Sequence, residues 1–235
     1  MTSVIGRLAA RFRGGIFKSQ KGQDRWVLGE VLPWKTRGFF LDLAAADGLT
    51  HSNTHVLEKW FGWRGICIEP NPKFFAELKA RRSCAADPSV ISNRRERIRF
   101  RIDNGQLGGV VADDTDNSPR VRGNQLSRAE IVELEARPLN DVLARHNAPA
   151  VIDYFSLDVE GCEERIITTL DFGKYQFRCL TVERPTPVVN EVLFRHGYVF
   201  VKNHSFDSFY VHHSVLEERP TIRCEPFEQV PPKDW

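Results

Sequence analysis

Hydrophobic runs and helix-like stretches alternate along the chain from about residue 38 to residue 212. The hydrophobic runs predict strands at 38–43, 64–69, 151–158 and 177–183, followed by a closing pair at 198–202 and 208–212. Between these runs, helical patterns occupy 72–82, 139–146, 161–170 and 187–196. The alternation predicts an α/β fold. The near-continuous hydrophobic run 151–158 indicates a central strand that is buried on both faces.

The middle of the chain gives a weaker pattern. A third strand is expected somewhere in 83–92, and a further strand candidate covers 131–136. Residues 98–102 alternate hydrophobic and basic side chains, as an edge or half-exposed strand does. Residues 104–125 are rich in Gly, Asp and Asn and have no period, which predicts a long loop. Long loops in compact domains are often lids or binding loops.

The stretch 38–48 carries the first candidate chemistry. Its hydrophobic run ends in a tight turn of small residues, and a helical pattern follows from about Ser52, with Ser52 or Asn53 as the N-cap. The next strand ends in an acid, Glu69. This is the beginning of a nucleotide-binding βαβ unit, in which backbone N–H groups at a helix start contact the ligand. An acid at the end of the second strand can bind both hydroxyls of a ribose.

The turn does not suit a pyrophosphate. The dinucleotide fingerprint needs three glycines, whereas this turn has a single late glycine, Gly48, and an acid, Asp47, where a diphosphate would lie. S-adenosylmethionine has no phosphate and offers an ammonium, a sulfonium and a ribose diol. We therefore expect Asp42 and Asp47 to serve the ammonium end, directly or through water, and Glu69 to bind the ribose. The alternative for the two aspartates is turn and N-cap chemistry.

Several motifs in fixed order resemble the FkbM family of methyltransferases. They are the stretches SQKGQD (19–24), GFFLDLAAADG (38–48), THSNT (50–54), LEK (57–59), GWRGICIEPNP (62–72), IDYFSLDVEG (152–161) and LTVE (180–183). The resemblance implies an S-adenosylmethionine-dependent enzyme of the Rossmann-like class I methyltransferase fold. The expected sheet has seven strands, is mostly parallel and ends in a C-terminal β-hairpin. Characterised members mostly methylate hydroxyls of sugars, glycolipids or polyketide-type natural products. Ala44 departs from the pattern, because many members have glycine there.

The candidate cofactor residues extend beyond the first turn. Gln23 is expected to hydrogen-bond the methionine part of the cofactor if the N-terminal segment folds over the cleft; the alternative is a helix cap before 25–31. Pro70 sets the chain direction after the second strand, and Asn71 either reaches the adenosine or only forms a turn. The full set of cofactor-binding candidates is Gln23, Asp42, Ala44, Asp47, Gly48, Ser52, Asn53, Glu69, Pro70 and Asn71.

A second chemical centre follows the central strand. Asp158 and Glu160 lie at its carboxyl end, and Glu183 ends the neighbouring strand. Carboxylates that converge on one cleft need a divalent cation, Arg184 or a proton to neutralise them. Oxygen ligands suit Mg²⁺ or Mn²⁺, which would lower the pKa of a bound hydroxyl. In the alternative, Asp158 holds the cofactor or a turn, Glu160 caps a helix and Glu183 pairs with Arg184.

Methyl transfer to an alcohol needs a base, because an alcohol is a poor nucleophile until its proton is shared. Asp158 is the first candidate for this catalytic role and His51 the second. The alternative for His51 is an N-terminal helix residue that shapes the loop. His204, His212 and His213 lie near the last two strands, where this fold often meets its substrate.

Composition restricts the partners. A net charge of +2 argues against a general nucleic-acid binder, and no hydrophobic run is long enough to span a bilayer. Residues 79–101 hold eight Lys or Arg, which either attract an anionic substrate or form a solvated surface. Five cysteines without a C-x-x-C pair indicate neither a disulfide framework nor a zinc site, so a cytoplasmic location is expected.

Three parts are expected along the chain: a basic N-terminal segment 1–18, a methyltransferase domain 19–215 and a C-terminal tail 216–235. The stretch 4–17 suits either a membrane-surface amphipathic helix or a docked terminal helix. The predicted function is O-methylation of a small-molecule or glycan substrate, in a protein that could be a homo-oligomer. The alternatives are N-methylation of a small amine, a non-catalytic scaffold with the cofactor fold, and a nucleotide-sugar or dinucleotide enzyme.

Overall fold

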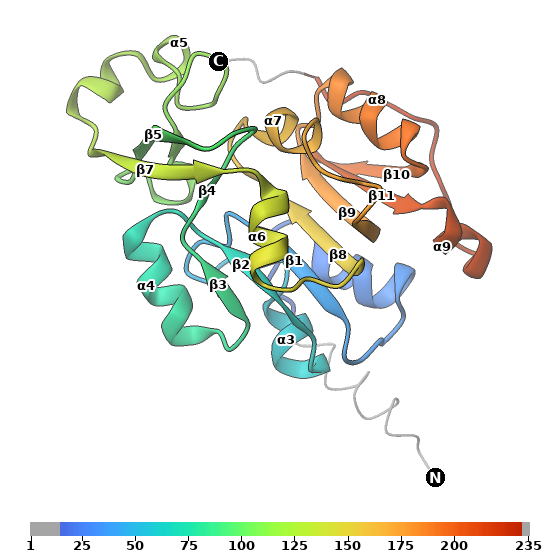
Figure 1. Cartoon of the computed structure of the whole chain (residues 1–235). Helices are drawn as coiled ribbons and strands as arrows, with labels where there is room; N and C mark the ends of the chain where they lie inside the picture. Colours follow the sequence, from blue (N-terminus) through green and yellow to red (C-terminus); the bar gives the residue numbers. More distant parts are fainter. Residues whose placement is uncertain (1–14, 232–235) are drawn as a thin grey trace.

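The computed structural model describes residues 15–231 and is built on a seven-stranded sheet (Figure 1). The strand order is β10-β11-β9-β8-β1-β2-β3. The strands are β1 (Phe39–Leu43), β2 (Arg64–Ile68), β3 (Ala85–Asp87), β8 (Val151–Leu157), β9 (Gln176–Glu183), β10 (Tyr198–His204) and β11 (Asp207–His212). β11 runs antiparallel to both of its neighbours, and the other pairs are parallel. The expected seven-stranded, mostly parallel sheet with a closing hairpin is confirmed.

Helices cover both faces of this sheet because the side chains of its central strands alternate between two hydrophobic cores. Leu41 and Phe155 pack on one face, and Phe40 and Tyr154 on the other. The first face is covered by α6 (Leu139–Arg145), α7 (Glu163–Ile167) and α8 (Pro187–Arg195). The second face is covered by α2 (Gln23–Trp26), η1 (Val27–Val31), α3 (His55–Phe61), α4 (Pro72–Arg81) and α9 (His213–Glu218). The predicted burial of β8 on both faces is confirmed.

A second, four-stranded sheet lies beside the first and was not predicted. Its order is β4-β7-β5-β6, formed by β4 (Val90–Ile91), β5 (Glu96–Arg101), β6 (Gly109–Val110) and β7 (Ile131–Arg137). The strand candidates at 98–102 and 131–136 therefore belong to this sheet. The stretch 83–92 contains both β3 and β4. Val90, Phe100 and Cys162 share a small core that fixes the second sheet against the start of α7.

Two further predictions need correction. The region 104–125 is not an irregular loop, since it contains β6, α5 (Pro119–Arg122) and the 3-10 turns η2 (Gly105–Leu107) and η3 (Gly123–Arg128). Helix α3 begins at His55 with Thr54 as its N-cap, later than predicted. The left-handed backbone of His51, with φ of 58°, interrupts the helical path before that point. The Ser52 hydroxyl still accepts hydrogen bonds from the N–H groups of Thr54 and His55.

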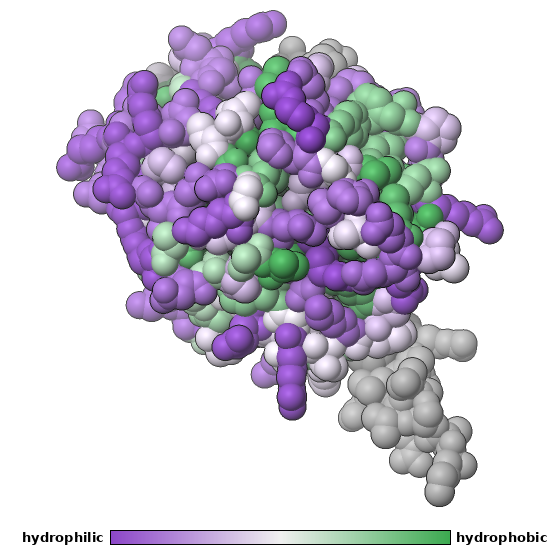
Figure 2. Space-filling model, turned by 45° about the vertical axis from the view of Figure 1, so that its right-hand side comes forward, coloured by the Kyte–Doolittle hydropathy of each residue, from purple (hydrophilic) through white to green (hydrophobic). Residues whose placement is uncertain are grey.

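The two ends of the chain differ in what the structure describes. Most of the N-terminal stretch 4–17, for which a helix was proposed, lies outside the described residues. Near the other end, α9 spans position 215, and the following segment is mostly exposed. Its Gln229 contacts Pro185 and Asn190, and Val230 is buried. Within residues 15–231, no helix is long and apolar enough to cross a membrane. The face in Figure 2 is mostly hydrophilic, with smaller hydrophobic areas between.

Candidate active site

Two adjoining pockets lie at the carboxyl ends of the central parallel strands. The first, here called the apolar pocket, is lined by Leu43, Ala44, Ala46, Ile68, Glu69, Pro70, Asn71, Phe74, Ser89, Val90, Ile91, Phe100, Gly105, Gln106, Gly108, Gly109, Val110, Val159, Glu160 and Cys162. The second, the acidic pocket, is lined by Gln20, Lys21, Gln23, Asp42, Leu43, Ala44, Ala45, Ala46, Thr50, His51, Ser52, Asn53, Gln106, Leu107, Ser156, Asp158, Glu160, Glu183, Phe206 and Asp207. Because five residues line both, the two pockets are halves of one cleft.

Glu69 is the ionisable group at the end of β2 in the apolar pocket. One carboxylate oxygen accepts a hydrogen bond from the Ala46 N–H at 2.8 Å, and the other from the Asn71 N–H at 2.7 Å. Burial raises the pKa of Glu69 to about 7, against the effect of these two hydrogen bonds. Each oxygen keeps the capacity to accept a further bond. Glu69 therefore joins the first turn to the chain after β2, and its position suits a diol.

Asp42 extends from β1 into the acidic pocket and is buried. Burial raises its pKa, although the Thr54 hydroxyl donates a hydrogen bond to it at 2.6 Å and Arg82 lies nearby. Ser52 and Asn53 line the same pocket, and the Asn53 amide donates to the Ser156 hydroxyl at 2.9 Å. The structure thus brings these three candidates to one wall of the cleft.

Asp47 and Gly48, two of the cofactor candidates, line neither half of the cleft. The Asp47 carboxylate accepts hydrogen bonds from the N–H groups of Leu49 and Thr50 and from the Thr50 hydroxyl, and it pairs with Arg81. Burial would raise its pKa, but these bonds outweigh burial and lower it. A Cβ at Gly48 would lie 2.6 Å from Leu78. Asp47 therefore performs the turn chemistry that was its alternative, and Gly48 serves packing.

The first turn is strained where it borders the cleft. Ala44, Ala46 and His51 have φ values of 56°, 47° and 58°, in the left-handed region that disfavours a side chain. Ala44 therefore adopts a backbone conformation that glycine reaches more easily. Strained backbone of this kind concentrates at binding and catalytic sites.

The N-terminal segment borders the acidic pocket. Gln20, Lys21 and Gln23 line it. Gln23 opens α2, and its amide donates to the Asp207 carboxylate at 2.8 Å. Burial and the nearby Glu183 raise the pKa of Asp207 to about 7. Contact between Gln23 and a cofactor stays a prediction.

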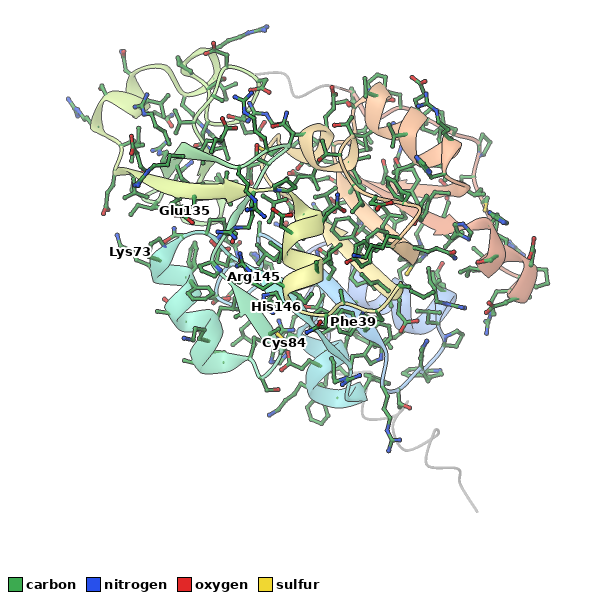
Figure 3. All side chains as sticks on the ribbon, viewed as in Figure 1. Phe39, Lys73, Cys84, Glu135, Arg145 and His146 are labelled. Atoms are coloured by element: carbon green, nitrogen blue, oxygen red, sulfur yellow. The ribbon has the colours of Figure 1, made fainter. Side chains whose placement is uncertain are left out.

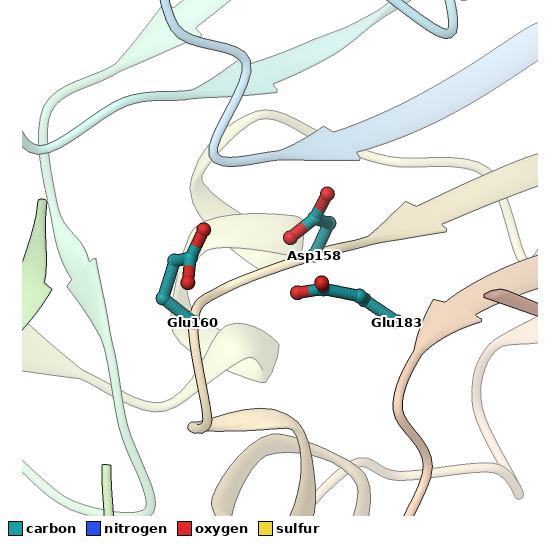
Figure 4. Close-up of side chains that lie close together, drawn as sticks. All are labelled: Asp158, Glu160 and Glu183. Carbon is teal, nitrogen blue, oxygen red and sulfur yellow. The ribbon is translucent and has the colours of Figure 1, made fainter. Parts of the chain in front are cut away.

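Three carboxylates meet at the floor of the acidic pocket (Figure 4). One ligand oxygen from each of Asp158, Glu160 and Glu183 lies within 4.8 Å of the others. Burial raises the pKa of Asp158 well above its usual range, and the charges of Glu183 and Glu160 add to the effect. Asp207 lies opposite Glu183 in the β9–β11 register, so a fourth carboxylate borders the cluster.

Residues 42–217 match the model of the methyltransferase FkbM domain. The chain belongs to this family. Its fold is similar to that of a methyltransferase FkbM from Methylobacillus flagellatus KT, with 14% identity, a TM-score of 0.46, and coverage of 75% of this chain and 44% of that one. It is also similar to a TehB-like SAM-dependent methyltransferase from Corynebacterium glutamicum, with 12% identity, a TM-score of 0.42, and coverage of 88% and 96%.

A third similar structure is Aeropyrum pernix fibrillarin in complex with natively bound S-adenosyl-L-methionine. Its identity is 14% and its TM-score 0.40, with coverage of 82% of this chain and 73% of that one. The chain spans less than half the length of the Methylobacillus FkbM protein. No curated protein matches the chain in sequence.

The rim of the acidic pocket in this FkbM domain carries an aromatic ring that sequence reasoning missed. Phe206 lines the pocket and is 48% exposed, and the Arg184 guanidinium lies 4.2 Å from its ring centre. Arg184 also donates to the Glu183 carboxylate at 2.5 Å, as the alternative for Glu183 anticipated. Glu160, with φ of 55°, and Arg184, with φ of 42°, are left-handed residues that follow β8 and β9.

Among the described histidines, His51 lines the cleft, whereas His204, His212 and His213 line neither of its halves. His51 lies within hydrogen-bond distance of the Gln106 amide oxygen, at 3.1 Å, and the Gln106 amide donates to the Thr50 carbonyl. The region after β5 therefore closes over the first turn, which favours a loop-shaping role for His51. The N-cap of α7 is Cys162 rather than Glu160. The Glu163 carboxylate accepts a hydrogen bond from the Val159 N–H.

Proposed function

We propose that this FkbM domain is an S-adenosylmethionine-dependent O-methyltransferase. The adenosine would occupy the apolar pocket with its ribose at Glu69, and the cationic methionine end would occupy the acidic pocket. The observation that carries this proposal is the division of one cleft into an apolar half that ends at an acid and a carboxylate-rich half. Negative charge at the joint between the halves opposes a pyrophosphate and favours a cation.

The cofactor residues that fit the proposal are those on the cleft wall. Glu69, Pro70 and Asn71 line the adenosine half. Asp42, Asn53 and Gln23 line the methionine half. When bound, the cofactor supplies an electrophilic methyl group on a sulfonium. The residues of this chain orient the donor and acceptor, which is the main requirement of an in-line transfer.

Asp158 is the proposed base for the acceptor hydroxyl. Its contact with Glu183 and its raised pKa support a pair of carboxyls that shares a proton. A cation beside such a pair favours its ionised form. The ionised Asp158 carboxylate would then accept the hydroxyl proton as the oxygen bonds to the methyl group. The nearby charges of Glu160 and Glu183 would favour the proton once Asp158 has accepted it.

A hard cation is the alternative means of neutralising this cluster. Asp158, Glu160 and Glu183 offer oxygen ligands of the type that Mg²⁺ or Mn²⁺ prefers. These residues would hold the ion, and the ion would lower the pKa of a hydroxyl that binds it. A chelator distinguishes the two schemes, because a shared proton survives chelation and a metal-dependent reaction does not.

Phe206 supports an acceptor with a ring. An exposed aromatic side chain at the mouth of a carboxylate-lined pocket suits a molecule that has an apolar ring face and hydroxyl groups at its edge. A sugar, a glycolipid head or a cyclic natural product has this chemistry. A protonated amine is the second candidate acceptor, because the same carboxylates attract it.

Two measurements test the proposal. Calorimetric titration should give tight binding of S-adenosylhomocysteine and no binding of NAD. The reverse would indicate a dinucleotide enzyme, and binding of neither would indicate a scaffold.

In the second measurement, a metabolite extract is incubated with the protein and a methyl-labelled donor, with and without EDTA. Mass spectrometry should reveal a labelled O-methyl ether, whereas a labelled N-methyl product would establish the amine alternative.

A further inference from the structure

A pair of thiols connects β2 with the chain just before β3, and neither thiol lines the cleft. Cys67 belongs to β2 and is fully buried, and Cys84 lies just before the neighbouring β3. Their sulfur atoms are 3.5 Å apart, which is contact between two thiols and about 1.5 Å longer than a disulfide bond. The β2–β3 register places Cys67 opposite Ala86, so Cys84 lies diagonally across the strand pair. Bond formation requires the two sulfurs to approach by about 1.5 Å.

The two thiols differ in access. Cys84 is half-buried and lines a surface cavity with Phe39, Trp63 and His146. Figure 3 labels Phe39, Cys84 and His146 close together. Cys67 has no exposed surface, and burial together with the neighbouring Cys84 thiol raises its pKa. A soluble reagent therefore reaches Cys84 first, and Cys67 is positioned to react with whatever Cys84 carries.

The thiol pair is coupled to the first turn through Arg82, two residues before Cys84. The buried Arg82 guanidinium donates to the Gly48 carbonyl at 3.1 Å and to the Thr54 hydroxyl at 3.0 Å. It also pairs with Glu58 at 2.5 Å. Thr54 in turn donates to Asp42 in the acidic pocket. A displacement at Cys84 would reach the cleft through this chain of hydrogen bonds.

We propose that Cys67 and Cys84 form a dithiol site that reacts reversibly with low-molecular-weight disulfides and lowers cofactor affinity when oxidised. The Cys84 thiolate attacks one sulfur of the small disulfide, whose S–S bond breaks and releases one thiolate. The Cys67 thiol then attacks the Cys84 sulfur of the mixed disulfide, and its proton passes to the departing thiolate. This step forms the Cys67–Cys84 bond and releases the second thiol, so the small disulfide gains the two electrons that the protein loses.

The effect on affinity follows from the geometry and rests on the proposed function. Closing the bond draws Cys84 toward β2 and moves Arg82 with it. The hydrogen bonds of Arg82 to Gly48 and Thr54 are then stretched, and Asp42 loses a fixed partner. Formation of the bond itself does not depend on what the cleft binds.

The test uses the full chain incubated with oxidised or reduced glutathione. Trypsin cleaves after Arg64, Lys73, Arg82 and Arg94, so Cys67 and Cys84 fall on separate peptides. Non-reducing mass spectrometry should detect their linkage after oxidised glutathione alone. Binding of S-adenosylhomocysteine should weaken about ten-fold and recover with dithiothreitol. The control Cys224→Ser removes an exposed cysteine and should retain both effects.

Two variants keep the outcome decisive. Cys84→Ser should abolish the linkage and the loss of affinity, and Cys67→Ala should stop the reaction at a stable glutathione adduct on Cys84. If wild-type Cys84 instead keeps a stable glutathione adduct and no Cys67–Cys84 bond forms, the proposed dithiol site is wrong. Linkage with unchanged affinity would overturn the coupling through Arg82. If the reduced protein does not bind S-adenosylhomocysteine, the proposed function fails, and peptide mapping still decides the thiol site.

Discussion

The two halves of the cleft solve different physical problems. The apolar pocket contains Glu69 among mainly hydrophobic side chains, with both carboxylate oxygens held by backbone N–H groups. The acidic pocket is lined by the carboxyls of Asp42, Asp158, Glu160, Glu183 and Asp207 and by Lys21. Arg184 pairs with Glu183, and Arg82 lies near Asp42. In the apolar pocket, the carboxylate already has hydrogen-bond partners within the chain. The acidic pocket concentrates like charges that protons or cations must relieve, so binding and proton transfer should be separable by mutation.

The largest effect is expected for Asp158→Asn. This change removes the proposed base and leaves the apolar pocket intact, so the rate of methyl transfer should fall about 10²- to 10⁴-fold. Binding of S-adenosylhomocysteine should stay within about three-fold of the wild type, an allowance of less than 1 kcal/mol. Radiolabelled methyl transfer and calorimetry measure the two quantities. Asp141→Asn, which removes a surface partner of Arg95, is the control and should change neither. If Asp158→Asn lowers the methyl-transfer rate and the affinity for S-adenosylhomocysteine to the same extent, catalysis and cofactor binding are not separated between the two halves.

The converse effect is expected for Glu69→Gln. The amide replaces one of two acceptor oxygens and removes the charge, so binding of S-adenosylhomocysteine should weaken about 10- to 100-fold, as loss of charge-assisted hydrogen bonds does. At saturating donor, the rate should fall much less than in Asp158→Asn. Glu133→Gln on the second sheet, where Glu133 pairs with Arg97, is the matched control. An unchanged dissociation constant would reject Glu69 as the ribose ligand.

The sequence was sufficient to place Glu69 at the cleft because the signal is local. A hydrophobic run that ends in an acid, 21 residues after a small-residue turn that ends at Gly48, defines the βαβ unit without further information. The role of Asp47 was not accessible in this way. Its orientation depends on Arg81, which lies on the next helix, and on a turn whose dihedral angles the side chains do not reveal.

The remaining misses come from long-range pairing. Asp207 reads as part of a turn, and the antiparallel register of β11 against β9 places it opposite Glu183. The second sheet depends on β4 pairing with β7, more than 40 residues away, through a two-residue strand that gives no pattern of its own. Phe206 differs, since an aromatic residue in a polar turn is a visible signal that was passed over.

The crowding of carboxyl groups in the acidic pocket should make the stability of the fold depend on pH. Burial raises the pKa of Asp207 from 3.8 to about 7, so the folded chain retains a proton that the unfolded chain loses above pH 4. This contribution is complete below pH 4 and disappears as the pH rises through 7. The Asp207→Asn variant lacks this pH-dependent contribution. As the pH rises from 5 to 7, the wild type should therefore lose stability relative to the variant, by about 1 kcal/mol of unfolding free energy per pH unit.

Urea unfolding at several pH values measures this difference without a ligand. Asp47→Asn is the control with the opposite shift. Its pKa is lowered, so its stabilising effect is present above pH 4 and is lost only below that value. The difference between Asp47→Asn and the wild type should therefore be constant from pH 5 to 7. If the difference in unfolding free energy between Asp207→Asn and the wild type is also constant from pH 5 to 7, the pKa of Asp207 is not raised in the folded chain.

The smallest effect concerns the joint between the halves, where Ala44 lines both pockets with φ of 56°. Ala44→Gly relieves the left-handed strain, and the greater freedom of glycine in the unfolded chain offsets part of the gain. We expect a net stabilisation of about 0.5–1 kcal/mol in urea unfolding. Ala86→Gly in β3 should instead destabilise, because a strand position carries no such strain. If Ala44→Gly loses stability to the same extent as Ala86→Gly, the strain at the joint is absent.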